Sequence, residues 1–150
     1  MKIWIDGDAC PAAIRDILFR AAARTGTELA IVANRPLRVP RSGHIRAIQV
    51  PGGADVADRE IAERMVAGDL VVTSDIPLAA EVVRKGGHAL SFRGEMYTGD
   101  NIGGRLNMRD FMATLRASGI DTGGQSALSG RDRQNFANRL DRFLARAGGG

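Results

Sequence analysis

The segment DLVVTSD, residues 69–75, constrains the fold more than any other part of the chain. Its centre is a short apolar run rich in β-branched residues, which is typical of a strand buried on both faces. Strands covered on both faces belong to parallel sheets with helices on either side. We therefore predict an α/β fold in which this strand is central and Asp75 stands at its carboxyl end.

Strand and helix patterns alternate through residue 92, as expected for a sheet of parallel strands. The predicted strands cover residues 2–6, 28–34, 45–50, 69–75 and 88–92. The predicted helices in the same part of the chain cover residues 11–25, 55–67 and 77–85. We expect a three-layer α/β fold, a parallel sheet of about four to five strands with helices on both faces.

The rest of the chain is predicted to be a C-terminal helical extension of the same single domain, residues 1–150, because this length most naturally makes one domain. Its predicted parts are glycine-rich loops at 93–107 and 118–130, helices at 108–117 and 131–147, and a disordered tail at 148–150. The last helix places Phe136, Leu140, Phe143 and Leu144 on one apolar face.

Composition excludes several classes of protein. No stretch approaches the roughly 20 apolar residues of a membrane helix, and the acidic start MKIWIDGD is not a secretory signal. The single cysteine, Cys10, excludes an internal disulfide framework and a cysteine-based zinc site. We expect a cytoplasmic protein.

Positive charge is concentrated in arginine. Residues 105–150 contain eight arginines against four aspartates, and the acid-free loop after residue 34 carries Arg35, Arg38 and Arg41. Clustered arginine favours a nucleic-acid partner, with these three as candidate phosphate contacts, although arginine usage can also reflect genome composition. We interpret Arg139, Arg142 and Arg146 as a solvated face of the last helix.

Several carboxylates are predicted to gather at one edge of the sheet. Asp6 and Asp75 end strands, and Asp8 follows Asp6 closely. Ligands bind at the carboxyl ends of parallel strands. Asp58 lies about 60° around its helix from the apolar residue Ile61, at the edge of the buried stripe. Asp6, Asp8, Asp58 and Asp75 therefore form a candidate site for Mg²⁺ or Mn²⁺, which prefer oxygen ligands.

Other polar residues have simpler interpretations. Asp55 is favoured as a helix N-cap, and Asp75 is equally compatible with capping the next helix. Asp69 is interpreted as structural because it starts its strand. Cys10 near a helix start is a weak candidate nucleophile. Asn34, Thr73, Ser74 and Asp55 are candidates for secondary roles around the site.

Three segments resemble the PIN-like nuclease superfamily: WID (4–6), ADREIA (57–62) and VVTSD (71–75). A closer resemblance, to the bacterial YaiI/YqxD family, covers nearly the whole chain. It rests on DGDACP, VANRPLRVP, GADVADREI, GDLVVTSDIPLAAEVV, RLNMRDFM and LSGRDRQNFANRLDRFL. That family is usually grouped with PIN-like folds, so the resemblance implies a PIN-like fold.

The resemblance to PIN domains implies metal-dependent hydrolysis of phosphodiesters, usually of RNA. Asp6, Asp58 and Asp75 match three acids of the four-acid PIN site and are the predicted catalytic residues. The fourth, a glutamate, has no counterpart, because residues 34–50 contain no acid. Asp8 or Asp55 could take its place.

Two alternatives stay open. An RNA-binding or regulatory module could keep this fold without cleavage, which fits the missing acid. A phosphatase of the haloacid-dehalogenase type could use Asp6 and Asp8 as nucleophile and acid–base partner, with Lys85 as the available lysine.

Overall fold

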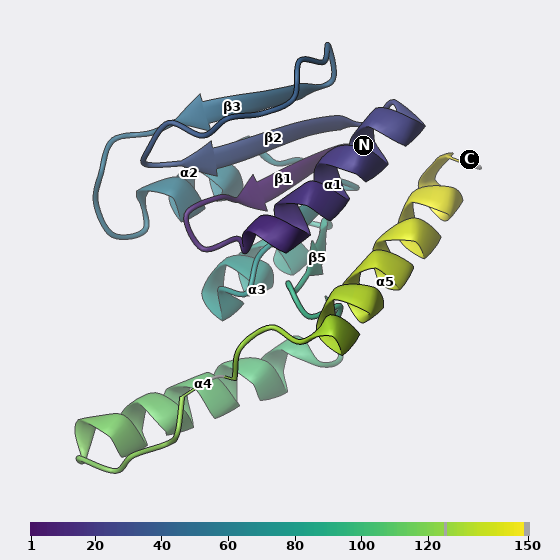
Figure 1. The fold of residues 1–150 in the computed structure, drawn as a ribbon. Helices are drawn as coiled ribbons and strands as arrows, with labels where there is room; N and C mark the ends of the chain where they lie inside the picture. The colour runs from purple at the N-terminus through teal and green to yellow at the C-terminus, as the bar shows by residue number, and fades with distance from the viewer. Residues whose placement is uncertain (125, 149–150) are drawn as a thin grey trace.

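A computed structural model describes residues 1–124 and 126–148 of the chain. Within these ranges, six strands form one sheet in the order β3-β2-β1-β4-β5-β6 (Figure 1). The strands are β1 (Lys2–Asp6), β2 (Glu28–Ala33), β3 (Ile45–Gln49), β4 (Leu70–Val72), β5 (His88–Leu90) and β6 (Met96–Tyr97). The helices are α1 (Ala12–Thr25), α2 (Val56–Arg64), α3 (Ile76–Arg84), α4 (Ile102–Ala117) and α5 (Gly130–Gly148).

The sheet lies between two helical layers, which confirms the predicted fold class. Strands β1 to β5 are mutually parallel, and β6 adds an antiparallel edge to β5. Side chains alternate between the faces of a strand, so Ile3 and Ile5 of β1 pack in the core beneath α1 and α5. Trp4 points to the opposite core, which α2 and α3 cover.

Local sequence explains where α1 begins and ends. Pro11 precedes its first residue, and Gly26 ends it in the left-handed conformation, with φ at 69°. The N–H of Gly26 donates to the carbonyl of Ala22, a glycine C-cap arrangement. The buried residues Ile14 and Leu18 lie one turn apart and face the sheet.

Asp69 fastens the amino end of the central strand, as its structural interpretation predicted. Its carboxylate accepts hydrogen bonds from the backbone N–H of Lys2 at 3.0 Å, the indole N–H of Trp4 at 3.1 Å and the backbone N–H of Val66 at 3.0 Å. Asp69 is only 4% exposed. A buried carboxylate with this many donors is satisfied by the protein itself.

The prediction of a loop over residues 93–107 is wrong in two places. Met96 and Tyr97 form β6, because they pair with Leu90 and Ala89 of β5. Helix α4 begins at Ile102, six residues earlier than the predicted start. Glycines in the first turn of α4 concealed that start. Figure 1 shows α4 projecting from the body of the domain, and none of its residues is buried.

The last helix closes the α1 side of the sheet with the face that its sequence predicted. Phe136, Leu140 and Leu144 are buried in the core there, and half-buried Phe143 packs against it. Gly148 belongs to α5, so the predicted disordered tail does not begin there, and residues 149–150 lie outside the described part. Across residues 1–124 and 126–148, no helix is both long and apolar enough to span a membrane.

A close approach of Gly94 to α5 makes the docking of that helix sensitive to one methyl group. A Cβ at Gly94 would lie 2.7 Å from the carbonyl carbon of Asn135, and its φ is +90°. We expect Gly94→Ala to lower the free energy of unfolding by about 2 kcal/mol or more in urea titrations. Gly99→Ala is the control, because a Cβ there meets nothing within 4 Å. Equal stability of the two variants would contradict this packing.

Candidate metal centre at the carboxyl edge of the sheet

The threonine hydroxyl of residue 73 joins two strand-end acids. Strands β1 and β4 are parallel neighbours, so their carboxyl ends lie at the same edge of the sheet. Asp6 is the last residue of β1, and Asp75 stands three residues beyond the end of β4. Thr73, fully buried, donates its hydroxyl to Oδ2 of Asp6 at 3.0 Å. The same hydroxyl accepts the backbone N–H of Asp75 at 3.0 Å. Thr73, predicted as a secondary residue, thus holds both acids in position.

Asp75 both caps a helix and contributes to an acidic cluster. One oxygen, Oδ1, accepts the backbone N–H of Leu78 at 2.9 Å and caps α3. One carboxylate oxygen of each of Asp55, Asp58 and Asp75 lies within 4.8 Å of the other two. We call these three residues the acidic cluster. Three oxygens at this spacing can share one divalent cation.

The prediction that the side chain of Asp55 caps a helix is wrong. It occupies the N-cap position of α2, but its side chain makes no capping hydrogen bond. Its φ is 65°, and among the described residues no other non-glycine has a positive φ. The left-handed backbone is a conformation that aspartate tolerates better than most residues. The carboxylate belongs to the acidic cluster instead.

Burial and neighbouring carboxylates raise the pKa values of two acids at this edge of the sheet. Burial, then the charge of Asp6, then contacts with Asp75 raise the pKa of Asp58 to about 7. Burial also raises the pKa of Asp6, which is 6% exposed, against the opposing hydrogen bond from Thr73. A divalent cation would relieve this repulsion and favour the ionised carboxylates.

A cavity of about 310 Å³ opens beside the acidic cluster. Asp55, Asp58 and Asp75 line one part of it, and Arg109 of α4 lines another. Arg109 had no predicted role, although it lies within the motif RLNMRDFM. No local signal could have found it, because only the packing of α4 brings it to the acids. Its guanidinium provides a positive group for an anionic ligand at the cluster.

The structure places Asp8 apart from the acidic cluster. Its two oxygens accept the backbone N–H of Asn34 at 3.2 and 2.9 Å, and Arg35 lies 3.7 Å from Oδ1. Asn34 therefore meets Asp8 through its backbone. The charge of Asp8 still helps to raise the pKa of Asp6.

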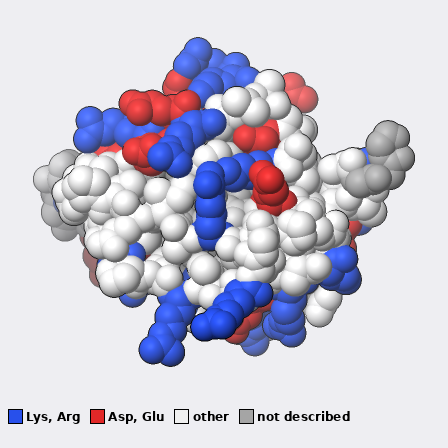
Figure 2. Space-filling view, turned by 90° about the horizontal axis from the view of Figure 1, so that it is seen from above, with Lys and Arg blue, Asp and Glu red and all other residues white. Residues whose placement is uncertain are grey.

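The arginines of the loop after β2 are not gathered at one point. Residues 34–44 carry the chain from the carboxyl end of β2 back to the amino end of β3, because the two strands are parallel. Arg35 thus stands near the acidic edge, whereas Arg41 lies toward the other end; Arg38 lies between them, and all three are exposed. On the face seen in Figure 2, basic side chains form separate groups, some interspersed with acids.

Two further candidates have structural surroundings. Ser74 accepts the backbone N–H of Phe92 at 3.3 Å, which ties the end of β4 to the segment after β5. Cys10 is buried, and burial raises the pKa of its thiol to about 12. A thiol with so high a pKa is a poor nucleophile at neutral pH.

Comparison with known proteins identifies the family of this chain. A protein-family sequence profile described as "Uncharacterized BCR, YaiI/YqxD family" matches residues 4–146. The chain belongs to the YaiI/YqxD family. It is 68% identical over 146 residues to a UPF0178 protein of Thioalkalivibrio sulfidiphilus, covering 97% of this chain and 99% of that one.

Other members of the family are similarly close over their full length. A UPF0178 protein of Halorhodospira halophila is 67% identical over 146 residues, 97% of each chain. One from Pectobacterium carotovorum is 63% identical over 147 residues, 98% of each chain. No solved structure matches the chain.

Removal of the Thr73 hydroxyl should lower the free energy of unfolding, because it breaks two hydrogen bonds of this buried side chain. Thr73→Val leaves Oδ2 of Asp6 and the N–H of Asp75 without their partner, at a cost of about 1–3 kcal/mol. Thr73→Ser keeps the hydroxyl and should lose clearly less. Urea unfolding of both variants measures the difference. Equal losses would show that the hydroxyl contributes no more to stability than the methyl group does.

The acidic cluster should make stability fall as pH rises toward neutrality. The folded pKa of Asp58, about 7, exceeds the ordinary value of 3.8, so between them the folded chain holds a proton that the unfolded chain has released. The free energy of unfolding then falls with rising pH, by at most about 1.4 kcal/mol per pH unit and less for a partly exposed group.

Urea titrations without metal at several pH values in this window measure that slope. Asp58→Asn should flatten it. Asp16→Asn, which removes an exposed carboxylate from α1, should leave the slope unchanged. An unchanged slope in Asp58→Asn would contradict the raised pKa.

Proposed function

We propose that this protein is a metal-dependent nuclease that hydrolyses phosphodiester bonds, with RNA as the substrate class and Mg²⁺ or Mn²⁺ as the cofactor. The observation that supports it most is the acidic cluster, three carboxylate oxygens within 4.8 Å of one another. Burial and the neighbouring carboxylates of Asp6, Asp75 and Asp55 raise the pKa of Asp58, and such crowded carboxylates favour cation binding.

In this proposal Asp55, Asp58 and Asp75 hold the cation. When bound, such a cation lowers the pKa of a water molecule and neutralises charge on a phosphate. Asp6 adds negative charge from its buried position and is kept in place by Thr73. Asp55 takes the place of the fourth PIN acid, a role for which its missing capping bond leaves it available.

Arginines near the cluster are suited to hold the substrate backbone. Arg109 lines the same cavity as the three acids. Arg35 stands near the carboxyl end of β2, on the side of Asp8. Their forked guanidinium groups match phosphate oxygens. Arg38 and Arg41 would contact a longer nucleic acid farther along the loop.

The phosphatase alternative finds less support in the contacts of the chain. Lys85 donates its ammonium group to the carbonyl oxygens of Ala62 and Met65, at the end of α2. It is therefore engaged in fastening α3 to α2. Asp8, the acid–base partner in that alternative, is held by the N–H of Asn34.

The first experiment is a thermal-unfolding titration with Mn²⁺ and Mg²⁺. Binding to the folded state alone stabilises by about 2.7 kcal/mol at a metal concentration of 100 Kd. We expect a saturable rise in wild type that Asp58→Asn and Asp75→Asn each abolish. Asp16→Asn, with the same change in charge on the opposite face, should keep the rise. No shift in wild type would count against metal binding by the free protein.

Cleavage is tested separately on single-stranded RNA labelled at one end. The nuclease proposal expects Mn²⁺-dependent products that EDTA and Asp75→Asn remove. Metal binding and RNA binding without any product would instead favour the RNA-binding module. In that case Asp75→Asn should bind RNA as well as wild type does.

A further inference from the structure

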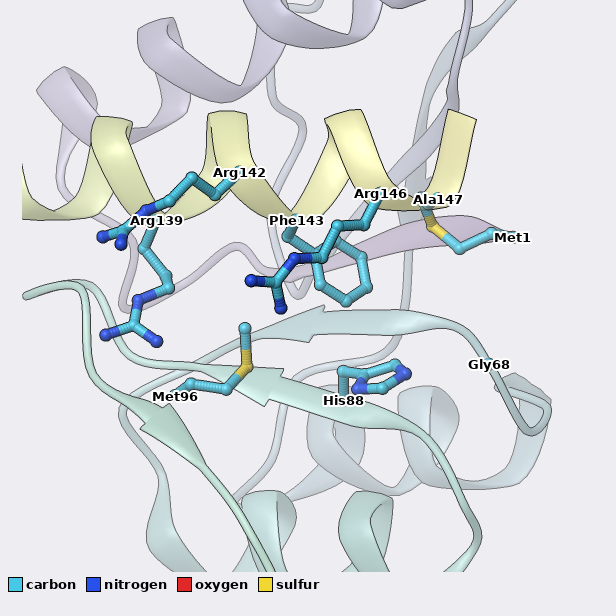
Figure 3. A pocket seen from close by; sticks show the side chains of 9 residues that line it. All are labelled: Met1, Gly68, His88, Met96, Arg139, Arg142, Phe143, Arg146 and Ala147. Carbon is cyan, nitrogen blue, oxygen red and sulfur yellow. The ribbon is translucent and has the colours of Figure 1, made fainter. Parts of the chain in front are cut away.

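A second cavity, of about 560 Å³, lies between α5 and the β5–β6 edge of the sheet. Figure 3 shows Arg139, Phe143 and Arg146 reaching from α5 toward His88 of β5 and Met96 of β6. This volume falls within the roughly 300–1,000 Å³ typical of small-molecule sites. We call it the arginine cavity.

The arginine cavity is separate from the acidic cluster. His88 is the first residue of β5, and two other lining residues, Met1 and Gly68, precede β1 and β4. These positions lie at the amino ends of parallel strands, whereas the acidic cluster lies at their carboxyl ends. A ligand in one site does not touch the residues of the other.

Three arginines on one side of α5 give the cavity its charge. Arg139, Arg142 and Arg146 all line it, and all three are exposed, as predicted for a solvated face of the helix. None of the three forms an ion pair with another described residue, and no carboxylate lines the cavity in the described part of the chain. Asp141, between them in sequence, pairs instead with Arg24 of α1 at 2.9 Å.

The remaining lining is apolar and aromatic. The rings of Phe143 and His88 meet edge to face, with centroids 5.0 Å apart and an interplanar angle of 64°. Met96 adds a thioether to the same side. Phe143 is half-buried and packs against the α1-side core, so its ring is held in place. A fixed aromatic wall below unpaired guanidinium groups suits a ligand with both a flat ring and negative charge.

We propose that the arginine cavity binds a small phosphorylated ligand of the nucleotide class. Its phosphate groups lie on the arginines of α5, and its ring lies against Phe143 and His88. Inorganic phosphate alone would leave the aromatic wall unused, and an uncharged ring would leave the guanidinium groups unpaired. This proposal does not depend on nuclease activity.

Isothermal titration calorimetry on the full chain tests it with ADP, adenosine and inorganic phosphate as separate probes. EDTA is present throughout, so that no metal at the acidic cluster recruits the phosphates. We expect ADP to bind at least about tenfold more tightly than either fragment, since it uses both parts of the cavity. Asp75→Asn should bind ADP as wild type does.

The matched variants carry the same loss of charge on the same helix. Arg139→Gln with Arg146→Gln should weaken ADP binding by about tenfold or more, because charge-assisted bonds to phosphate are lost. Arg131→Gln with Arg133→Gln, at exposed positions outside the cavity lining, should change it by less than about twofold. Thermal unfolding confirms that both double variants fold.

Four outcomes would overturn the proposal. Equal weakening in the two double variants would show non-specific attraction to a basic helix. Equal affinity for ADP and phosphate would show that the aromatic wall takes no part. Loss of binding in Asp75→Asn would move the ADP to the acidic cluster. Absence of ADP binding, with an RNA oligonucleotide bound through Arg139 and Arg146, would make the cavity part of a nucleic-acid surface.

Discussion

The parallel pairing of β1 with β4 places two carboxylates at one edge of the sheet, and a single hydroxyl holds them there. Thr73 donates to Asp6 and accepts from the backbone of Asp75, so that one buried side chain sets the position of both acids. Asp75 in turn caps α3, so the same acid also fixes the start of a helix that covers the Trp4 side of the sheet. Of the acidic cluster, Asp75 is positioned in this way, whereas Asp55 and Asp58 come from the start of α2, which packs on the same sheet.

The acids at the two ends of the central strand, β4, have different surroundings. At its amino end, Asp69 receives three N–H donors and needs no further partner. At its carboxyl end, Asp58 and Asp75 face other carboxylates, and burial and neighbouring charge raise the pKa of Asp58 to about 7. A protein can hold such crowded acids only by keeping a proton or by accepting a cation. The contrast makes the carboxyl end a candidate cation site.

Charge is separated along the strands as well. The acidic cluster and the arginine cavity lie at opposite ends of the sheet, and helices from the second half of the chain supply positive groups to each. Arg109 comes from α4, and Arg139 and Arg146 come from α5. The C-terminal extension therefore contributes to both candidate sites in addition to covering the α1 side of the core. Four of the eight arginines of residues 105–150 line these two cavities, Arg109 at one and Arg139, Arg142 and Arg146 at the other.

The sequence by itself determined the order of strands and helices through residue 92 and the position of Asp6 at the end of β1, whereas Asp75 stands three residues beyond β4, at the N-cap of α3. Those features depend on local periodicity, which short segments express without their neighbours. Only the tertiary structure decided that Asp55 joins the cluster, that Asp8 turns to Asn34, and that Tyr97 lies in a strand. It also decided which arginines line cavities. Each of these outcomes depends on contacts between separate segments, and the pattern of a single segment carries no information about the partner it will meet.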